Sequence, residues 1–232
     1  MRAPASLAVL AAAAACGGSE RTGAGGLCAF PPPVPARATT YAGPSAGACM
    51  LPAGLSLYAA VSPAVYAGSA GCGTCLEVTG PAATATVKIT DLCPECATNQ
   101  LDLSTDAWNA VTGSAPAGVA NVGWRRVPCD EPGPVRFVAG AGANPWFVLV
   151  VVQDHRYPIA AVEVLPAGAP AWLPLARDAA NQWARSAGGA GYPTPLHFRA
   201  MDAFGRVTTT TVPMAALEAG AVATAPQLDV CG

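Results

Sequence analysis

The sequence predicts an all-β protein made of two domains joined by a short linker. At 232 residues, 52% of them apolar, the chain is long enough to bury two hydrophobic cores. Short apolar runs alternate with Gly, Pro, Ser and Asn along most of its length, a pattern typical of β-strands and turns. The Pro- and Gly-containing segment at residues 130–134, DEPGP, marks the linker between the two halves.

The N-terminus has the pattern of an export signal. One Arg precedes a short apolar run that is too short to span a bilayer, and Cys16 and small residues follow. The Ala residues before Cys16 resemble a bacterial lipoprotein signal, in which this cysteine is lipidated; the alternative is an ordinary signal cleaved nearby. We therefore expect a signal peptide over residues 1–16 and a secreted protein, anchored to the outer membrane if Cys16 is acylated. Residues 17–37 have the composition of a flexible tether.

Residues 38–129 form the first predicted domain. Residues 104–113, STDAWNAVTG, have apolar residues at helical spacing and a terminal Gly, so they predict a short helix capped by Ser104. The predicted strands of this domain are the runs TTYAG, LSLYAAV, CLEVTG, TATVKITDL and GWRRVPC.

Residues 135–232 predict an all-β sandwich, because short strands recur at its characteristic spacing. Trp183 is expected in its core. His155 is expected to be structural, since the chain has only one other histidine, His197, and no nucleophile pattern. The predicted strands are VRFVAG, WFVLVVVQ, IAAVEVLP, AWLPLA, PLHFRAMD and RVTTTTVP.

The composition argues against several classes of function. Charged residues make up 11% of the chain and the formal net charge is -2, so no basic surface exists for nucleic acid. The sequence contains no P-loop and no Gly-rich dinucleotide fingerprint, and no cofactor is predicted.

Nine cysteines leave eight after Cys16 is set aside, an even number that favours disulfides in an exported protein. Two CxxC pairs, CGTC and CPEC, would suggest zinc in a cytosolic protein. Zinc requires thiolates, which export and oxidation tend to remove, so no metal site is predicted.

The segment VKITDLCPECATNQLDLS, residues 87–104, carries three carboxylates: Asp91, Glu95 and Asp102. A period of two puts Leu101 and Leu103 on one face of a strand and Asp102 on the other, away from the core. Asp102 is therefore placed either to meet a ligand, or to cap the following helix or accept backbone N–H bonds, and the residues alone favour neither interpretation.

Several motifs taken in order resemble the expansins, particularly the bacterial ones. They are TTYAG, CGTCLEVTGP, ATVKITDLCPE, LDLSTDAW and GWRRVPC, followed by WFVLVVVQDHRYPI. The resemblance covers roughly residues 38–232. It implies a six-stranded double-psi β-barrel related to glycoside hydrolase family 45, followed by an immunoglobulin-like β-sandwich that acts as a cellulose-binding, family 63 carbohydrate-binding module.

The resemblance also implies a function, namely loosening of cell walls without hydrolysis by disturbing noncovalent contacts between polysaccharides. Asp102 matches the acid that is critical for activity in the family. Thr40, Tyr41 and Asp91 match polysaccharide-binding groove residues, and Glu95, a further carboxylate of the same segment, is also expected to bind polysaccharide. Cys93 stands where some bacterial members have a groove tyrosine.

Hydrolysis of a glycosidic bond generally requires a second carboxyl group as base or nucleophile. The related hydrolases carry that Asp shortly after a Thr-x-Tyr motif, whereas the corresponding stretch of this chain, TTYAGPSAG, contains no carboxylate. Asp91 and Glu95 remain candidates for a second group. We therefore expect a protein that is not an enzyme, with residual lytic activity left open.

The resemblance suggests disulfides that pair Cys49 with Cys72 and Cys75 with Cys129. Two further pairs are hypotheses only, because sequence alone does not fix disulfide connectivity. They are Cys93 with Cys96, and Cys28 with Cys231.

In the second domain, family members stack three aromatic rings on glucose units. Trp146 and Phe147 match the first two, and the third position falls near Ala180. Neighbouring strand residues face opposite sides unless a bulge intervenes, so the expected platform is incomplete.

The sequence thus predicts a monomeric binder of cellulose and plant wall polysaccharides. Two alternatives remain. One is a lytic transglycosylase of peptidoglycan, because some double-psi barrels with a lone Asp do that chemistry. The other is a pure carbohydrate-binding protein for wall adhesion.

Overall fold

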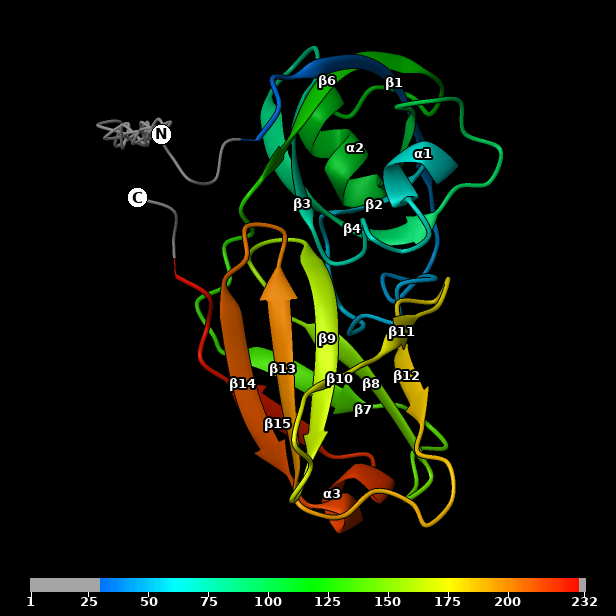
Figure 1. Cartoon of the computed structure of the whole chain (residues 1–232). Coiled ribbons are helices and arrows are strands. Elements are labelled where there is room, and N and C mark those ends of the chain that lie inside the picture. The colour runs from blue at the N-terminus through cyan, green and yellow to red at the C-terminus, as the bar shows by residue number, and fades with distance from the viewer. Residues whose placement is uncertain (1–29, 230–232) are drawn as a thin grey trace, which may run out of the picture.

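The computed structural model describes residues 30–229, which form a barrel and a sandwich stacked end to end (Figure 1). Both domains consist mainly of β-strands, as predicted, and each has its own buried apolar cluster. The predicted signal peptide, the lipidation site Cys16 and the pairing of Cys28 with Cys231 lie outside the described residues.

The first domain is a closed barrel of six strands in the order β1-β5-β2-β4-β3-β6. Two of its strand pairs, β1 with β5 and β2 with β4, are parallel, and the other four pairs are antiparallel. This arrangement fits the predicted double-psi barrel. The strands are β1 (Val34–Tyr41), β2 (Tyr58–Val61), β3 (Cys75–Thr79), β4 (Thr84–Leu92), β5 (Leu101–Ser104) and β6 (Ala120–Val127).

Helix α2 (Thr105–Thr112) follows β5 directly and covers one side of the barrel (Figure 1). The hydroxyl of Ser104 accepts the backbone N–H of Ala107 at 3.2 Å, and Gly113 ends the helix in the left-handed conformation. The predicted helix and its cap are confirmed. The sequence did not reveal α1 (Pro63–Tyr66), a single turn between β2 and β3.

The second domain is a sandwich of a four-stranded sheet, β10-β9-β13-β14, and a five-stranded sheet, β11-β12-β8-β7-β15. Trp183 is 4% exposed and lies in the core between them, as predicted. The elements are β7 (Val135–Ala139), β8 (Phe147–Gln153), β9 (Ile159–Pro166), β10 (Leu173–Pro174), β11 (Ala176–Arg177), β12 (Trp183–Ser186), β13 (Leu196–Asp202), β14 (Val207–Val212), α3 (Met214–Glu218) and β15 (Val222–Ala225).

The structure corrects three sequence predictions. The tether predicted over residues 17–37 extends too far, because residues 34–37 form the first half of β1 and pair with β6. Phe30 also packs against the sandwich, stacked on Tyr157 at 6.3 Å and edge-on to Phe204 at 5.7 Å between ring centroids. The single strand expected for AWLPLA is two short strands, β10 and β11, in different sheets. Strands β12 and β15 were not predicted.

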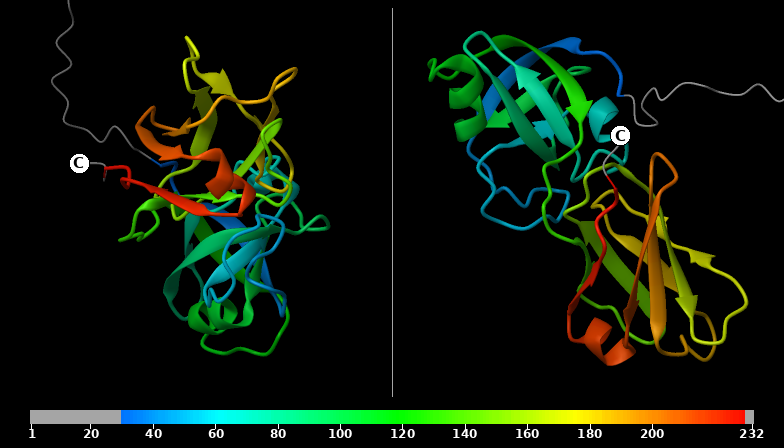
Figure 2. Two further views of the ribbon diagram at one scale, coloured as in Figure 1. Left: turned by 90° about the horizontal axis from the view of Figure 1, so that it is seen from below. Right: turned by 90° about the vertical axis from the view of Figure 1, so that its left-hand side faces the viewer.

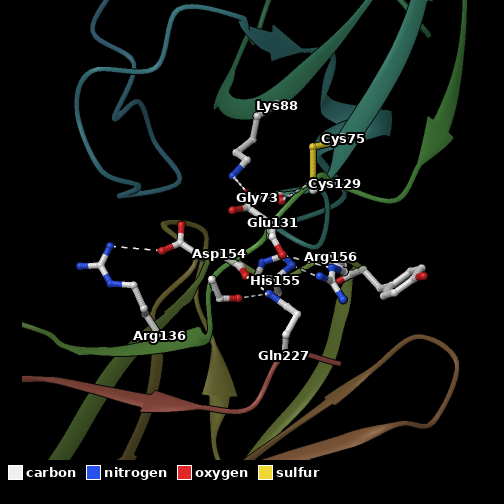
Figure 3. Close-up of polar contacts among 12 residues, drawn as sticks. Gly73, Cys75, Lys88, Cys129, Glu131, Arg136, Asp154, His155, Arg156 and Gln227 are labelled. Atoms are coloured by element: carbon white, nitrogen blue, oxygen red, sulfur yellow. Dashed lines mark hydrogen bonds and ion pairs between the residues drawn. A yellow bond between two sulfur atoms is a disulfide. The ribbon is translucent and has the colours of Figure 1, made fainter. Parts of the chain in front are cut away.

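The linker side of the domain interface is polar and tightly packed (Figure 3). Lys88 of the barrel forms an ion pair with Glu131 of the linker. His155 is 2% exposed, and its Nδ1 lies 2.8 Å from the carbonyl oxygen of Tyr157. A Cβ atom added to Gly73 would stand 2.7 Å from Nε2 of His155, so the imidazole packs directly on the barrel backbone. His155 is thus a structural residue, as predicted, and it packs between the two domains.

A second set of contacts joins the barrel to the β11–β12 hairpin, and further views show the two domains meeting along this boundary (Figure 2). The hydroxyls of Tyr66 and Ser69 donate to the carbonyl oxygens of Ala179 and Asp178, each at 2.6 Å. With contacts on both sides, the two domains have a defined mutual orientation.

Candidate functional site

One face of the barrel carries a row of four residues, each on a neighbouring strand. Asp91 of β4 is paired with Ala60 of β2, Ala60 with Asp102 of β5, and Asp102 with Thr39 of β1. Register partners point to the same side of a sheet, so the two carboxylates share a face. We call these residues the carboxylate row. Since two strand spacings separate them, the Cα atoms of Asp91 and Asp102 are about 10 Å apart.

Asp102 lies half-buried on this face because its neighbours on β5 face inward. Leu101 and Leu103 are both 0% exposed and belong to the barrel core. The hydroxyl of Thr39 donates to Oδ1 of Asp102 at 2.6 Å. The acid is thus fixed by a single side-chain hydrogen bond and keeps its second oxygen available. Ser104, not Asp102, caps α2, so the capping alternative is wrong.

Asp91 has a different environment from Asp102. Its Oδ1 accepts the backbone N–H groups of Ala48 at 2.8 Å and of Leu92 at 2.9 Å. A carboxylate bound to two backbone donors holds the loop around Ala48 against the end of β4. Asp91 therefore has a structural task at the row in addition to any contact with a ligand.

The structure places Thr40 away from the carboxylate row. Thr40 pairs with the core residue Leu103, and its hydroxyl is buried without a hydrogen-bond partner among the described residues. Thr39 is the threonine that meets Asp102, and the sequence reasoning did not name it. Strand alternation carries the missing signal, since a face that includes Tyr41 includes Thr39 and excludes Thr40.

Tyr41 stands beside the carboxylate row at the end of β1. Its ring packs edge-on against Tyr58, with centroids 5.9 Å apart and planes at 86°. Burial raises the pKa of the Tyr41 phenol, and the charges of Asp91 and Asp102 add to the rise. The hydroxyl therefore stays protonated, and its oxygen is buried without a hydrogen-bond partner among the described residues.

Glu95 does not join this group. It lies exposed on the turn after β4, between Cys93 and Cys96, and no hydrogen bond or ion pair to another described residue holds it. The structure thus brings together Asp91, Asp102 and Tyr41 from the predicted set and leaves Glu95 apart.

Three of the four predicted disulfides are present among residues 30–229. They join Cys49 to Cys72, Cys75 to Cys129, and Cys93 to Cys96. The first holds the loop that Asp91 binds, and the second fastens the end of the barrel beside the linker (Figure 3). Within that described part of the chain, no group of three or more His, Cys, Asp or Glu residues is arranged to hold a metal ion.

A short loop connects the carboxylate row to the sandwich. The loop residue Ala48 binds Asp91, and the carbonyl oxygens of the next two residues accept hydrogen bonds from the second domain. Asn181 Nδ2 donates to Cys49 O at 3.3 Å, and Gln153 Nε2 donates to Met50 O at 3.0 Å. The barrel face and the five-stranded sheet are therefore joined through adjacent backbone groups.

Trp146 and Phe147 differ in exposure. Trp146 lies in the turn before β8 and is 57% exposed, with its backbone N–H bound to Asn144 Oδ1 at 2.9 Å. Phe147 is half-buried and packs against the sandwich core. Trp146 thus offers a broad ring surface to a ligand, whereas Phe147 offers much less. The position near Ala180 has no aromatic side chain.

Comparison with solved structures decides the family. The crystal structure of expansin from Clavibacter michiganensis superimposes with a TM-score of 0.72 and 30% sequence identity, covering 85% of this chain and 99% of that one. The chain belongs to the expansin family. A mutant of the same expansin, solved in complex with cellohexaose, aligns with a TM-score of 0.70 and 30% identity over 83% of this chain and 95% of that one.

Curated expansins are similar in sequence. Expansin-YoaJ of Bacillus subtilis is 32% identical over 61% of this chain and 58% of its own length, and Expansin-B11 of rice is 33% identical over 66% and 59%. Expansin-like protein 2 of Dictyostelium discoideum is 36% identical over 61% of this chain. The match spans only 36% of that relative. No protein-family model matches the chain. No helix in the described part of this expansin has the length and apolar character needed to cross a membrane.

Proposed function

We propose that this expansin loosens cell walls without hydrolysis, by binding cellulose and related glucans and weakening the noncovalent contacts between chains. The observation that supports it best is the contrast between the two carboxylates of the row. Asp102 is held by one side-chain hydroxyl, whereas Oδ1 of Asp91 accepts two backbone N–H groups and so fixes the loop at Ala48. Asp102 has no backbone bond to maintain, so it is the acid more readily used by a sugar, whereas Asp91 also holds the barrel loop in place.

Hydrolysis is disfavoured by the same arrangement. An inverting glycosidase needs a second carboxylate that positions and deprotonates water on the opposite side of the sugar. Asp91 holds the loop at Ala48 instead, and Glu95 lies on an exposed turn outside the row. Asp102 can accept a hydrogen bond from a glucan hydroxyl without any covalent bond being broken.

Loosening requires that binding energy be used to separate a chain from its neighbours. A glucan held at both the barrel face and Trp146 spans two surfaces that the loop at Cys49 and Met50 joins through hydrogen bonds. Because this connection limits how far the two surfaces can adapt, the bound chain must adopt the shape that they impose. The strained chain is then more easily detached from the polymer surface.

The relatives support the proposed substrate, and the disulfides support the proposed location outside the cell. The Clavibacter expansin mutant was solved in complex with cellohexaose, and its fold matches 83% of this chain. Three disulfides among residues 30–229 suit an oxidising compartment, so we place the action of the protein outside the cell, at polysaccharide walls.

The test combines creep of isolated plant walls under constant load with measurement of reducing sugar. The wild-type protein should increase creep and release no reducing sugar from cellulose or xylan. Asp102→Asn should abolish creep while retaining its circular dichroism spectrum and melting temperature. Asp106→Asn is the matched control, since Asp106 is exposed in the first turn of α2 and lies outside the carboxylate row.

Three results would contradict the proposal. Steady release of reducing sugar that disappears in Asp102→Asn would make the protein a hydrolase. Anhydro-muropeptides released from isolated sacculi would identify a lytic transglycosylase instead. Creep activity that is unchanged in Asp102→Asn would remove this residue from the function.

A further inference from the structure

Among residues 30–229, Arg37 is the only Lys or Arg side chain that forms no hydrogen bond and no ion pair. The chain has 12 Lys and Arg residues, and two of them, Arg2 and Arg21, lie outside residues 30–229, which leaves ten. Five of these form ion pairs, and four donate to backbone or hydroxyl oxygens. The ion-paired residues are Lys88, Arg125, Arg136, Arg199 and Arg206, and the other four are Arg126, Arg156, Arg177 and Arg185.

The side chain of Arg37 lines a hollow on the outside of the barrel. The hollow has a volume of about 340 Å³ and lies between the first half of β1, the segment before β5, and β6. Gln100 and Asn121, which flank Arg37 on the two neighbouring chain segments, also line it. None of the lining residues is Asp or Glu. They are Pro35, Ala36, Arg37, Ala97, Thr98, Gln100 and Asn121.

This hollow continues the face that carries Asp102. Arg37 precedes Thr39 by two residues on β1, so both side chains point to the same side of the strand. Gln100 precedes Asp102 by two residues in the same way. Gln100, Arg37 and Asn121 therefore form a second row, parallel to the carboxylate row and about 7 Å from it along the strands.

The chemistry of the second row suits a carboxylate on a sugar. The guanidinium offers a planar pair of N–H donors that matches a carboxylate, and nothing in the described structure competes for it. Gln100 uses its Oε1 to accept the N–H of Ala97 at 3.2 Å, which turns its amide nitrogen into the available donor. Asn121 is exposed and adds a further amide. Neutral glucans have no group that makes use of the charge of Arg37.

We propose that Arg37, with Gln100 and Asn121, forms a subsite for the uronic acid branches of a matrix polysaccharide, such as the glucuronic acid units of glucuronoxylan. This inference rests on the proposed function, because the backbone of the polysaccharide is taken to lie along the row of Asp102. The barrel then distinguishes acidic matrix glycans from unsubstituted ones at a position next to its central acid.

The test measures binding to soluble glucuronoxylan by affinity electrophoresis, with the same polymer after chemical reduction of its carboxyl groups as the matched ligand. The wild-type protein should bind the native polymer about fivefold more tightly than the reduced one, the gain expected of one exposed charge pair. Arg37→Gln should bind both polymers equally, at the level of the reduced one. Arg37→Glu should bind the native polymer more weakly than the reduced one.

Arg125→Gln is the control, since it removes the same charge from the same domain at a residue that Glu77 already neutralises. It should retain the preference for the native polymer. Binding to insoluble cellulose should be the same in all these variants. If the proposed function is wrong, the wild-type protein will not bind cellulose. This result is independent of the comparison between native and reduced glucuronoxylan.

The uronic acid subsite would be contradicted if the wild-type protein bound native and reduced glucuronoxylan equally. It would also be contradicted if Arg37→Gln lost affinity for isolated sacculi alone, because the carboxylates of peptidoglycan would then be the ligand.

Discussion

Thr39 of β1 donates its hydroxyl proton to Oδ1 of Asp102 on the parallel strand β5, at a distance of 2.6 Å. Within residues 30–229 it is the only side-chain hydrogen bond to this acid, so it sets the direction in which the other carboxylate oxygen points. Thr39→Val keeps the shape and removes the donor. We expect wall creep to fall several-fold, since a hydrogen bond to a charged group contributes about 1.5–3 kcal/mol.

Thr40→Val is the matched control for that experiment. Thr40 has a buried hydroxyl without a hydrogen-bond partner among the described residues, so its loss should leave creep unchanged and should not lower the melting temperature. An equal loss of creep in both variants would show that Thr39 has no special relationship with Asp102.

Substitution of Trp146 should weaken cellulose binding, whereas substitution of Phe147 should lower the stability of the sandwich. Trp146→Ala removes a ring that is 57% exposed, so binding to insoluble cellulose should fall by about tenfold with little change in the free energy of unfolding. Phe147→Ala opens a gap at the edge of the sandwich core and should cost about 2 kcal/mol of stability. Pull-down isotherms and urea unfolding measure the two effects. Equal losses of binding with no change in stability would mean that both rings lie on the ligand surface.

His155 should make the stability of the protein depend on pH. Burial lowers the pKa of this imidazole to about 4 in the folded state, while the unfolded chain binds a proton near the ordinary value of 6.5. Between these values the unfolded state holds more protons, so stability is lost as the pH falls from about 6.5 to 4. The loss should be on the order of 3 kcal/mol.

Urea unfolding at a series of pH values tests this prediction. In His155→Gln the part of the pH slope that comes from the imidazole should disappear, even if the variant is less stable throughout. A slope identical to that of the wild type would show that His155 titrates in the folded state as it does in the unfolded chain.

The disulfides should differ in their effect on stability according to the length of chain that they close. Cys75 and Cys129 are 54 residues apart, whereas Cys93 and Cys96 are 3 apart. Loop-closure entropy predicts a loss of about 4 kcal/mol for replacing the first pair by alanine and about 2 kcal/mol for the second. Unfolding of the two double variants in urea provides the comparison. Equal losses would exclude chain entropy as the main contribution.

Gly73 should be intolerant of a side chain because of its contact with the sandwich. Gly73→Ala combines a left-handed backbone, at φ +70°, with a Cβ atom 2.7 Å from Nε2 of His155. Gly68→Ala has the same kind of backbone, at φ +61°, and no atom within 4 Å. The control should lose about 1 kcal/mol and Gly73→Ala at least twice that. Melting temperatures that fall equally would show that the domain interface adapts to the added methyl group.

Much of the fold follows from local pattern. The helix after Ser104 was predictable because a capping hydroxyl, apolar spacing and a terminal Gly all act within ten residues. The alternation in LDLS correctly placed Leu101 and Leu103 in the core and Asp102 outside it. Short strands such as β12 and β15 escaped prediction, since four residues carry too little periodicity to distinguish a strand from a loop.

Only part of the candidate site could be predicted from the sequence. Family resemblance pointed to Asp102 and Tyr41, and both lie at the carboxylate row. It also pointed to Thr40, although strand alternation places Thr39 beside Asp102. Glu95 follows Asp91 by four residues, but it lies on the exposed turn that the disulfide between Cys93 and Cys96 closes and is not a register partner of the row.

The sequence by itself determined the two all-β domains, the helix cap and the outward position of Asp102, because these depend on residues that are close together along the chain. Only the tertiary structure decided which side chains meet Asp102 and what Asp91 does. Thr39 is 63 residues away from Asp102, and Ala48 is 43 residues away from Asp91. Such contacts depend on strand order and register, which the closing of the barrel sets and no local pattern encodes.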